Sequence, residues 1–111
     1  MNVEIHVLDE FKRQFRRLSK KYRSLADDLE AFQKSLIENP FQGSDLGGGV
    51  RKVRMAISSK RKGKSGGARV LTLNLLVSSD VEVTLLTIYD KEDVANVSDN
   101  YVRWLITEAK K

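Results

Sequence analysis

The hydrophobic pattern of this chain changes its period from about 3.6 residues to two near position 50, which restricts the fold to a mixture of helices and strands. Before that point, two stripes of apolar residues follow the spacing of one helix face. Their members are Leu8, Phe11, Phe15, Leu18 and Tyr22, then Leu25, Leu29, Phe32 and Leu36. Ser24 is a candidate N-cap between the stripes, and Asn39-Pro40 ends the second one, so the pattern predicts a hairpin of two helices.

Four segments are predicted to be strands. Residues 2–7 and residues 52–57 alternate apolar and polar side chains, as half-buried strands do. Residues 69–77 and 81–89 are apolar on both faces over much of their length, which places them in the centre of the sheet. Ser78-Ser79-Asp80 joins these two as a hairpin turn.

The remaining segments complete the predicted architecture. Residues 43–49 are expected to form a loop, residues 58–67 a flexible basic loop, and Ser98 caps a short helix carrying Val102 and Leu105. The order of elements predicts an α+β fold of two layers, with an antiparallel-rich sheet, a helical hairpin on one face and a short C-terminal helix. The length predicts a single domain over residues 1–111. The other sheet face must then be covered by something else or be a working surface.

The net charge of +5 is concentrated in one block. Residues 1–45 hold eight basic and eight acidic residues, and residues 80–111 hold four basic and seven acidic ones. Residues 46–79 hold no acid and eight basic residues, namely Arg51, Lys52, Arg54, Lys60, Arg61, Lys62, Lys64 and Arg69. Such a block favours a polyanionic partner, although a merely soluble, flexible loop remains the alternative.

Composition excludes several kinds of chemistry. The chain has no cysteine and only one histidine, which excludes disulfides and thiolate sites and makes histidine-based metal clusters or a Ser-His-Asp triad improbable. His6 falls on the polar side of its strand, so it is predicted to be a surface residue rather than a ligand. Asp90, Glu92 and Asp93 are expected to form a solvated turn rather than a metal site. No secretory signal or bilayer-spanning run is visible, which favours a cytoplasmic protein without a membrane partner.

Four basic residues are predicted to share one sheet face. Lys52 and Arg54 are two apart in a strand and therefore project together. Arg69 lies across from them if the flanking strands pair antiparallel, and Lys91 follows the last strand beside Tyr89. The resulting concavity suits a backbone phosphate. Pattern alone leaves two interpretations about equally open, which are RNA binding or cleavage and ordinary solvated strand residues.

RNA cleavage by such a face needs no protein nucleophile, because the attacking 2′-hydroxyl belongs to the substrate. Cationic side chains can orient the scissile phosphate and stabilise its developing charge. A lysine crowded by other cations can serve as the base, whereas arginine does not deprotonate. These considerations predict that Arg69 stabilises the phosphate and that Lys52 or Arg54 orients the 2′-hydroxyl, with Lys52 the better base.

Three strings of this sequence, GGGVRKVRMA, SKRKGKSGGARVL and LLTIYDKEDV, resemble the RelE/ParE toxin superfamily, most closely its HigB-like branch. The detailed resemblance covers about residues 43–94. It implies a toxin of a type II toxin–antitoxin pair that cuts messenger RNA in the ribosomal A site, without metal or cofactor. Carried over residue by residue, the family's catalytic positions are Lys52, Arg54, Arg69 and Lys91. The RNA- and ribosome-binding residues are expected to be Arg51, Lys60, Arg61, Lys62 and Lys64.

The resemblance also leaves alternatives open. Some members place a tyrosine near the start of the final helix; that position is Val97 here, and Tyr101 follows four residues later. ParE-like members inhibit DNA gyrase instead of cutting RNA, and a non-catalytic ribosome- or nucleic-acid-binding module is a third possibility. The implied partners are a cognate antitoxin, encoded by an adjacent gene and expected to be a helix-turn-helix protein, together with the ribosome and messenger RNA.

Overall fold

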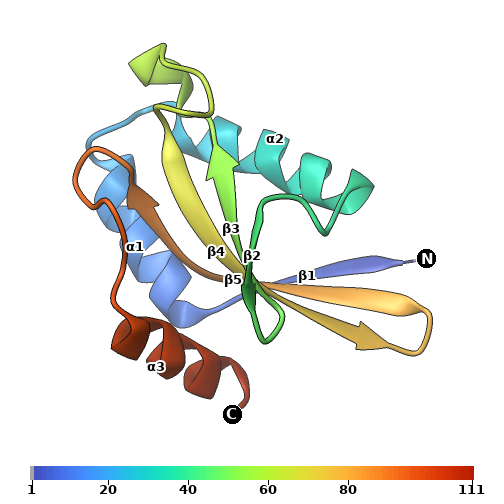
Figure 1. Cartoon of the computed structure of the whole chain (residues 1–111). Coiled ribbons are helices and arrows are strands. Elements are labelled where there is room, and N and C mark those ends of the chain that lie inside the picture. Colours follow the sequence, from blue (N-terminus) through green and yellow to red (C-terminus); the bar gives the residue numbers. More distant parts are fainter. Residues whose placement is uncertain (1) are drawn as a thin grey trace.

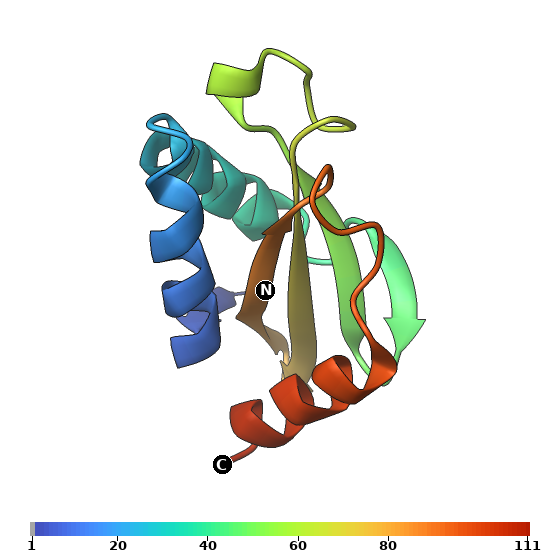
Figure 2. The same ribbon diagram turned by 90° about the vertical axis from the view of Figure 1, so that its left-hand side faces the viewer.

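Five strands form one sheet, and helices lie on both of its faces (Figures 1 and 2). The computed structural model describes residues 2–111. In chain order the elements are β1 (Val3–Val7), α1 (Asp9–Ser19), α2 (Leu25–Glu38), β2 (Ser44–Gly47), β3 (Val50–Met55), the 3-10 turn η1 (Ser58–Lys60), β4 (Ala68–Val77), β5 (Asp80–Asp90) and α3 (Asp99–Ala109). The predicted α+β class, helical hairpin and short C-terminal helix are confirmed.

The strands lie in the order β1-β5-β4-β3-β2. Among the described strands, β1 and β5 pair in parallel and the other neighbours pair antiparallel. The prediction that the two most apolar strands are central is confirmed, because β4 and β5 each have a strand on both sides. Burial on both faces explains their nearly continuous apolar sequence.

The sheet contains one strand that the sequence did not indicate. The segment expected to be a loop, residues 43–49, includes β2, which pairs with β3 through Ser44↔Lys52 and Asp45↔Arg51. All four residues of β2 are exposed, so the segment has no apolar alternation by which a strand is recognised. Its strand geometry arises from the free edge of β3, which offers backbone hydrogen-bonding partners.

The helical hairpin covers one face of the sheet. Phe11 of α1 and Phe32 and Leu36 of α2 are buried against the inward side chains of the strands, including Val53 and Val83. Each of these strand positions is at most 2% exposed. The alternation in β3 is as predicted, since Val53 and Met55 face the helical hairpin while Lys52 and Arg54 face the opposite way.

The opposite face is only partly covered. Leu105 of α3 is fully buried against Leu71, Leu73 and Leu86 of the central strands. Ser98 caps this helix as predicted, because its Oγ accepts a hydrogen bond of 3.1 Å from the backbone N–H of Tyr101. The other end of the face, towards the ends of β3 and β5, carries polar and charged side chains instead.

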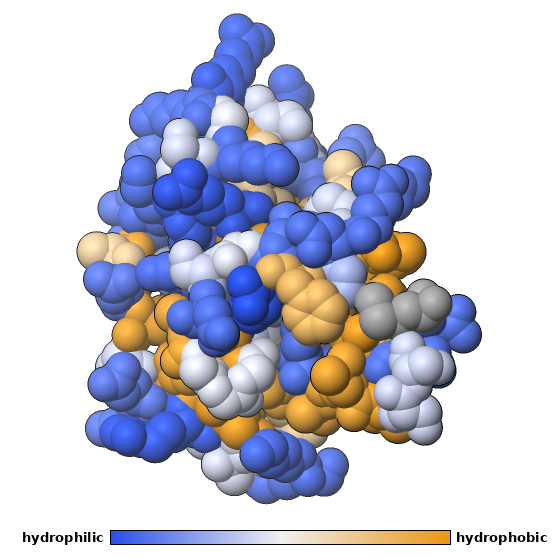
Figure 3. Space-filling view, turned by 45° about the vertical axis from the view of Figure 1, so that its right-hand side comes forward, coloured by the Kyte–Doolittle hydropathy of each residue, from blue (hydrophilic) through white to orange (hydrophobic). Residues whose placement is uncertain are grey.

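One end of the molecule exposes apolar side chains. The β4–β5 hairpin and β1 extend past the helices (Figure 1), and Figure 3 shows apolar groups gathered around that end, whereas the opposite end of the same view is hydrophilic. The hairpin contributes Leu75, Leu76 and Val77, which are 47–71% exposed.

Candidate functional site

The open end of the second sheet face is a pocket of about 380 Å³, within the volume range of small-molecule sites. Its walls come from β2, β3, β4 and the segment after β5, and the lining residues are Ser44, Lys52, Arg54, Arg69, Lys91 and Ala95. We call it the cationic pocket. All four residues predicted to share a face line this one pocket, and no carboxylate of the described chain lines it.

Sheet register explains why these four side chains meet. The basic loop (residues 58–67) lets β3 and β4 pair antiparallel, so that Arg54 lies directly opposite Arg69. Arg69 in turn lies opposite Tyr89 of β5. Lys91 is two residues beyond Tyr89, and its backbone N–H donates to the Gly67 carbonyl at 3.2 Å. Alternation along each strand then points the cations to one side.

Backbone carbonyls bind the Arg69 guanidinium, and no carboxylate of the described residues forms an ion pair with it. Its residue is only 9% exposed, and its guanidinium donates to the carbonyls of Lys64, Ser65 and Ala68 at 3.1–3.2 Å. These acceptors are neutral, and no carboxylate of residues 2–111 lies within ion-pair distance of Arg69. The positive charge therefore remains available to an anionic ligand.

Tyr89 of β5 lies opposite Arg69 in the neighbouring strand. Its ring is 9% exposed and its hydroxyl has no hydrogen-bond partner in the described chain. Burial raises the pKa of Tyr89, and the nearby Arg69 charge opposes that rise. Tyr89 therefore remains neutral at physiological pH and gives Arg69 an apolar wall on one side.

The pairing of Arg54 with Arg69 places like charges directly opposite each other, an arrangement that destabilises a sheet. We expect Arg54→Thr, which removes one charge and keeps strand propensity, to raise the free energy of unfolding by about 0.2–1 kcal/mol. Urea unfolding measures the change. The same substitution should lower the activity of the protein, so a variant that is both less stable and fully active would contradict a functional reason for this pair.

The basic loop is anchored rather than flexible at its first turn. Asp28 of α2 is buried, and its carboxylate accepts hydrogen bonds from the N–H and the hydroxyl of Ser58 at 2.9 and 2.5 Å. At the other end of the loop, a Cβ on Gly67 would lie 2.2 Å from the Met55 carbonyl, so any side chain there would push β4 away from β3. Both features fix the start of β4, and with it Arg69.

A buried ion pair ties this loop to the end of β5. The Lys60 ammonium donates to Asp90 at 2.8 Å and lies 3.2 Å from Glu92, while the Tyr22 hydroxyl donates to Asp90 at 2.5 Å. The Lys60 side chain is 5% exposed and that of Asp90 is fully buried. The expectation of a solvated turn is therefore wrong for Asp90. Its carboxylate is buried and accepts hydrogen bonds from Lys60 in the basic loop and from Tyr22 after α1.

Lys60, Asp90 and Tyr22 form a junction between the basic loop, β5 and the segment after α1. The pKa values of Lys60 and Asp90 follow from the hydrogen bonds of this junction. Burial by itself would raise the pKa of Asp90, but hydrogen bonds from Lys60 and Tyr22 outweigh it and hold that pKa below its usual value. Burial would likewise lower the pKa of Lys60, and the hydrogen bonds to Asp90 and Glu92 raise it overall. Both groups are therefore charged at neutral pH.

The five residues predicted to bind RNA differ in their exposure and in their partners. Lys60 is held inside the protein, and Lys62 forms an ion pair of 2.7 Å with Glu92 while remaining exposed. Arg51 alternates with Lys52 in β3, does not line the cationic pocket, and donates to the carbonyls of Gln42 and Gly43. The exposed loop cations without a carboxylate partner in the described chain are Arg61 and Lys64. The acid-free block is thus partly neutralised by acids from the end of β5, which the local sequence does not reveal.

Tyr101 lies outside the cationic pocket. Its hydroxyl donates to Glu10 of α1 at 2.5 Å and lies 2.9 Å from the Thr87 hydroxyl. Burial first, and the Glu10 carboxylate second, raise the pKa of Tyr101 to about 12. The side chain therefore joins α3 to α1 and β5, and it is not placed to stack on a group bound in the cationic pocket.

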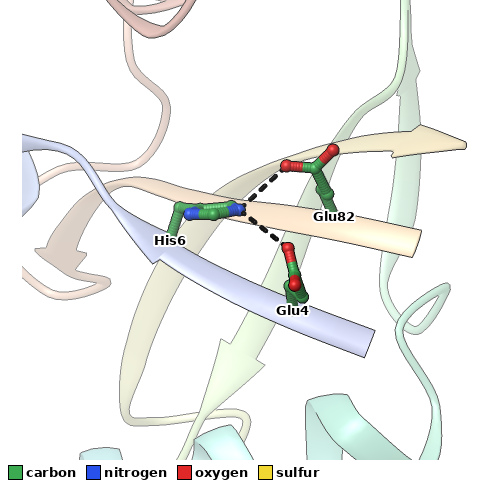
Figure 4. Close-up of side chains that lie close together, drawn as sticks. All are labelled: Glu4, His6 and Glu82. Atoms are coloured by element: carbon green, nitrogen blue, oxygen red, sulfur yellow. Dashed lines mark hydrogen bonds and ion pairs between the residues drawn. The ribbon is translucent and has the colours of Figure 1, made fainter. Parts of the chain in front are cut away.

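His6 is an exposed residue of the edge strand, as predicted. Figure 4 shows its imidazole between the carboxylates of Glu4 and Glu82, with Nε2 at 3.7 and 2.9 Å from them. Strand β4 lies between this group, which is on β1 and β5, and β3, and none of its three residues lines the cationic pocket. Glu82 could not be assigned to this group from the sequence, because the contact depends on the parallel register of β1 and β5.

The fold is α+β, and the cationic pocket on its open sheet face is lined by four cations and by no acid of residues 2–111, a lining that suits an anionic ligand such as a phosphodiester. No helix of residues 2–111 has both the length and the apolar character that a bilayer crossing requires. Residues 6–111 match the family described as the RelE toxin of the RelE / RelB toxin-antitoxin system. The chain therefore belongs to the RelE toxin family. It is the toxin of a toxin–antitoxin system, in a family of endoribonuclease toxins with cognate antitoxins.

Proposed function

We propose that this protein is a HigB-like, ribosome-dependent endonuclease that cuts messenger RNA in the ribosomal A site without a metal ion. One observation carries the proposal, namely that Lys52, Arg54, Arg69 and Lys91 converge on a single pocket. Because four cations and no carboxylate line it, the pocket attracts a phosphate and repels a divalent metal ion. Membership in the RelE toxin family supports the same function.

The reaction then follows from the chemistry of RNA. The 2′-oxygen attacks the adjacent phosphorus, the bond from phosphorus to the 5′-oxygen breaks, and the products carry a 2′,3′-cyclic phosphate and a 5′-hydroxyl. Lys52 in its neutral amine form takes the proton of the 2′-hydroxyl and becomes an ammonium, and the Lys91 ammonium gives a proton to the departing 5′-oxygen. Arg69 binds the phosphate oxygens in the transition state, and Arg54 orients the phosphate beside it.

The rigid support of the pocket contributes to catalysis in this scheme. Asn96 lies 3.2 Å from the Lys52 ammonium, and the loop carbonyls hold the Arg69 guanidinium. Side chains that are already oriented before the substrate binds need little reorganisation free energy during the reaction. Cytoplasmic ribosomes and messenger RNA are the partners, and an antitoxin from an adjacent gene restrains the activity. Arg61 and Lys64 contribute to docking on ribosomal RNA, whereas the buried Lys60 does not.

A modified message tests this function directly. Purified protein is incubated with ribosomes that hold a short message in the A site, in the presence and absence of a chelator that spares the ribosomal magnesium. We expect cleavage to be insensitive to the chelator and to be abolished by a 2′-deoxy substitution at the nucleotide before the cut, because that change removes the attacking oxygen. Cleavage of the 2′-deoxy message would contradict the mechanism. Intact transcripts together with inhibited DNA supercoiling would instead support the gyrase alternative.

A further inference from the structure

Helix α1 and the turn after it carry a second concentration of positive charge, outside the cationic pocket. Between residues 12 and 23 there are seven basic residues and no acid. All seven are exposed, and they are Lys12, Arg13, Arg16, Arg17, Lys20, Lys21 and Arg23. The apolar side of the same helix packs on the sheet, so the charges lie on its outer side.

Within residues 2–111, carboxylates form ion pairs with two of these seven residues. Arg13 pairs with Glu10, and Lys21 lies 3.9 Å from both Asp90 and Asp93. No carboxylate in the part of the chain that the structure describes forms an ion pair with Lys12, Arg16 or Lys20. We call these three residues the α1 stripe.

The α1 stripe opposes the stability of its own helix. Its members are spaced four residues apart, so each lies above the next on the helix surface, and like charges at this spacing destabilise a helix. The stripe is about 12 Å long at about 1.5 Å per residue. A row of cations without internal partners is relieved of this repulsion when a chain of phosphates lies along it.

The α1 stripe and the cationic pocket lie on different sides of the sheet. Lys21, in the turn after α1, and Lys60, in the basic loop, contact the same Asp90 carboxylate, so the two basic segments meet at one end of the molecule. Helix α1 lies on one side of the sheet (Figure 2), whereas Lys52 and Arg54 of β3, which line the cationic pocket, face the opposite side. A substrate strand in the pocket therefore leaves the α1 stripe free for another anion.

We propose that the α1 stripe is a docking surface for ribosomal RNA, separate from the pocket that receives the message. This inference rests on the proposed ribosome-dependent function and adds the surface by which the protein is oriented on the ribosome. Since phosphate contacts position a protein without reading sequence, the stripe supplies affinity and orientation rather than cleavage specificity.

The test compares two variants with the same change of net charge. The first is Lys12→Gln/Arg16→Gln/Lys20→Gln, and the matched control is Lys34→Gln/Lys110→Gln/Lys111→Gln. In the control, Lys34 and Lys111 already pair with Glu30 and Glu108. Binding to purified ribosomes is measured by sedimentation between about 50 and 200 mM salt, where phosphate contacts are strongly salt-dependent. Binding to vesicles of anionic phospholipid is measured in parallel, and a melting curve checks that each variant is folded.

We expect the stripe variant to bind ribosomes at least tenfold more weakly at the lower salt concentration. Its salt slope should fall by about two to three, since each lost phosphate contact removes about one unit. The control should stay close to wild type. Equal ribosome binding by the two variants would overturn the proposal, and so would a loss confined to the vesicles. Because binding is measured without cleavage, a protein that binds through the stripe but cuts no message would contradict the proposed function and leave this inference standing.

Discussion

Replacing Arg69 by alanine is expected to reduce message cleavage by about 100-fold or more, because it removes the guanidinium that we propose binds the scissile phosphate in the transition state. Arg69 is the most deeply buried of the four pocket cations, and its guanidinium is oriented by three carbonyls. Single-turnover cleavage on programmed ribosomes measures the effect. Growth after induced expression gives the corresponding result in cells, where we expect the toxicity to disappear.

A matched control separates catalysis from charge and folding. Arg103→Ala removes one exposed arginine of α3 that does not line the pocket, and it should leave cleavage within about twofold of wild type. Arg69→Lys keeps the charge and loses the forked geometry, so an intermediate rate is expected. A folded Arg69→Ala protein with undiminished cleavage would remove Arg69 from the catalytic assignment.

The largest effect on stability is expected at Asp90. Asp90→Ala leaves the Lys60 ammonium buried and removes the acceptor of the Tyr22 hydroxyl. Breaking a buried ion pair from one side costs about 3–5 kcal/mol, and we expect the lower end because Glu92 still lies 3.2 Å from Lys60. Such a loss is a large part of the total stability of about 5–15 kcal/mol that is usual for a domain. Chemical denaturation measures it.

Two controls make this prediction specific. Asp93→Ala removes a neighbouring carboxylate that is 59% exposed, and we expect a change below about 0.5 kcal/mol. The double variant Lys60→Met/Asp90→Leu removes both charges together and should recover most of the lost stability, because a buried ion pair can be replaced by apolar groups. Equal losses in the free energy of unfolding for Asp90→Ala and Asp93→Ala would contradict a stabilising role of the Lys60–Asp90 ion pair.

The same junction predicts how stability depends on pH. The folded state lowers the pKa of Asp90, so its ionised form contributes stability above the unfolded pKa of about 4. That contribution is lost as the pH falls below about 4 and through the lower folded pKa. In Asp90→Asn the acid side of the stability profile should therefore be flatter than in the wild type.

Periodicity and spacing were sufficient for most of the fold. The helical stripes of residues 8–36, the alternation around Val53 and the apolar runs of residues 69–77 and 81–89 are local patterns, and each specifies its own element. The exposed strand β2 has no such pattern, since only the edge of β3 makes it a strand. The convergence of Lys52, Arg54 and Arg69 was predictable from one assumption about antiparallel pairing, which the register confirms.

The sequence by itself determined which residues carry charge and which face of each element they occupy. Only the tertiary structure decided which of those charges remain available. Lys60 and Arg69 belong to the same acid-free block, yet Asp90 neutralises Lys60 inside the protein, whereas backbone carbonyls hold Arg69 with its charge intact. The physical reason is that an ion pair depends on distance in space. Asp90 lies 30 residues from Lys60 along the chain, and the fold brings their atoms to 2.8 Å.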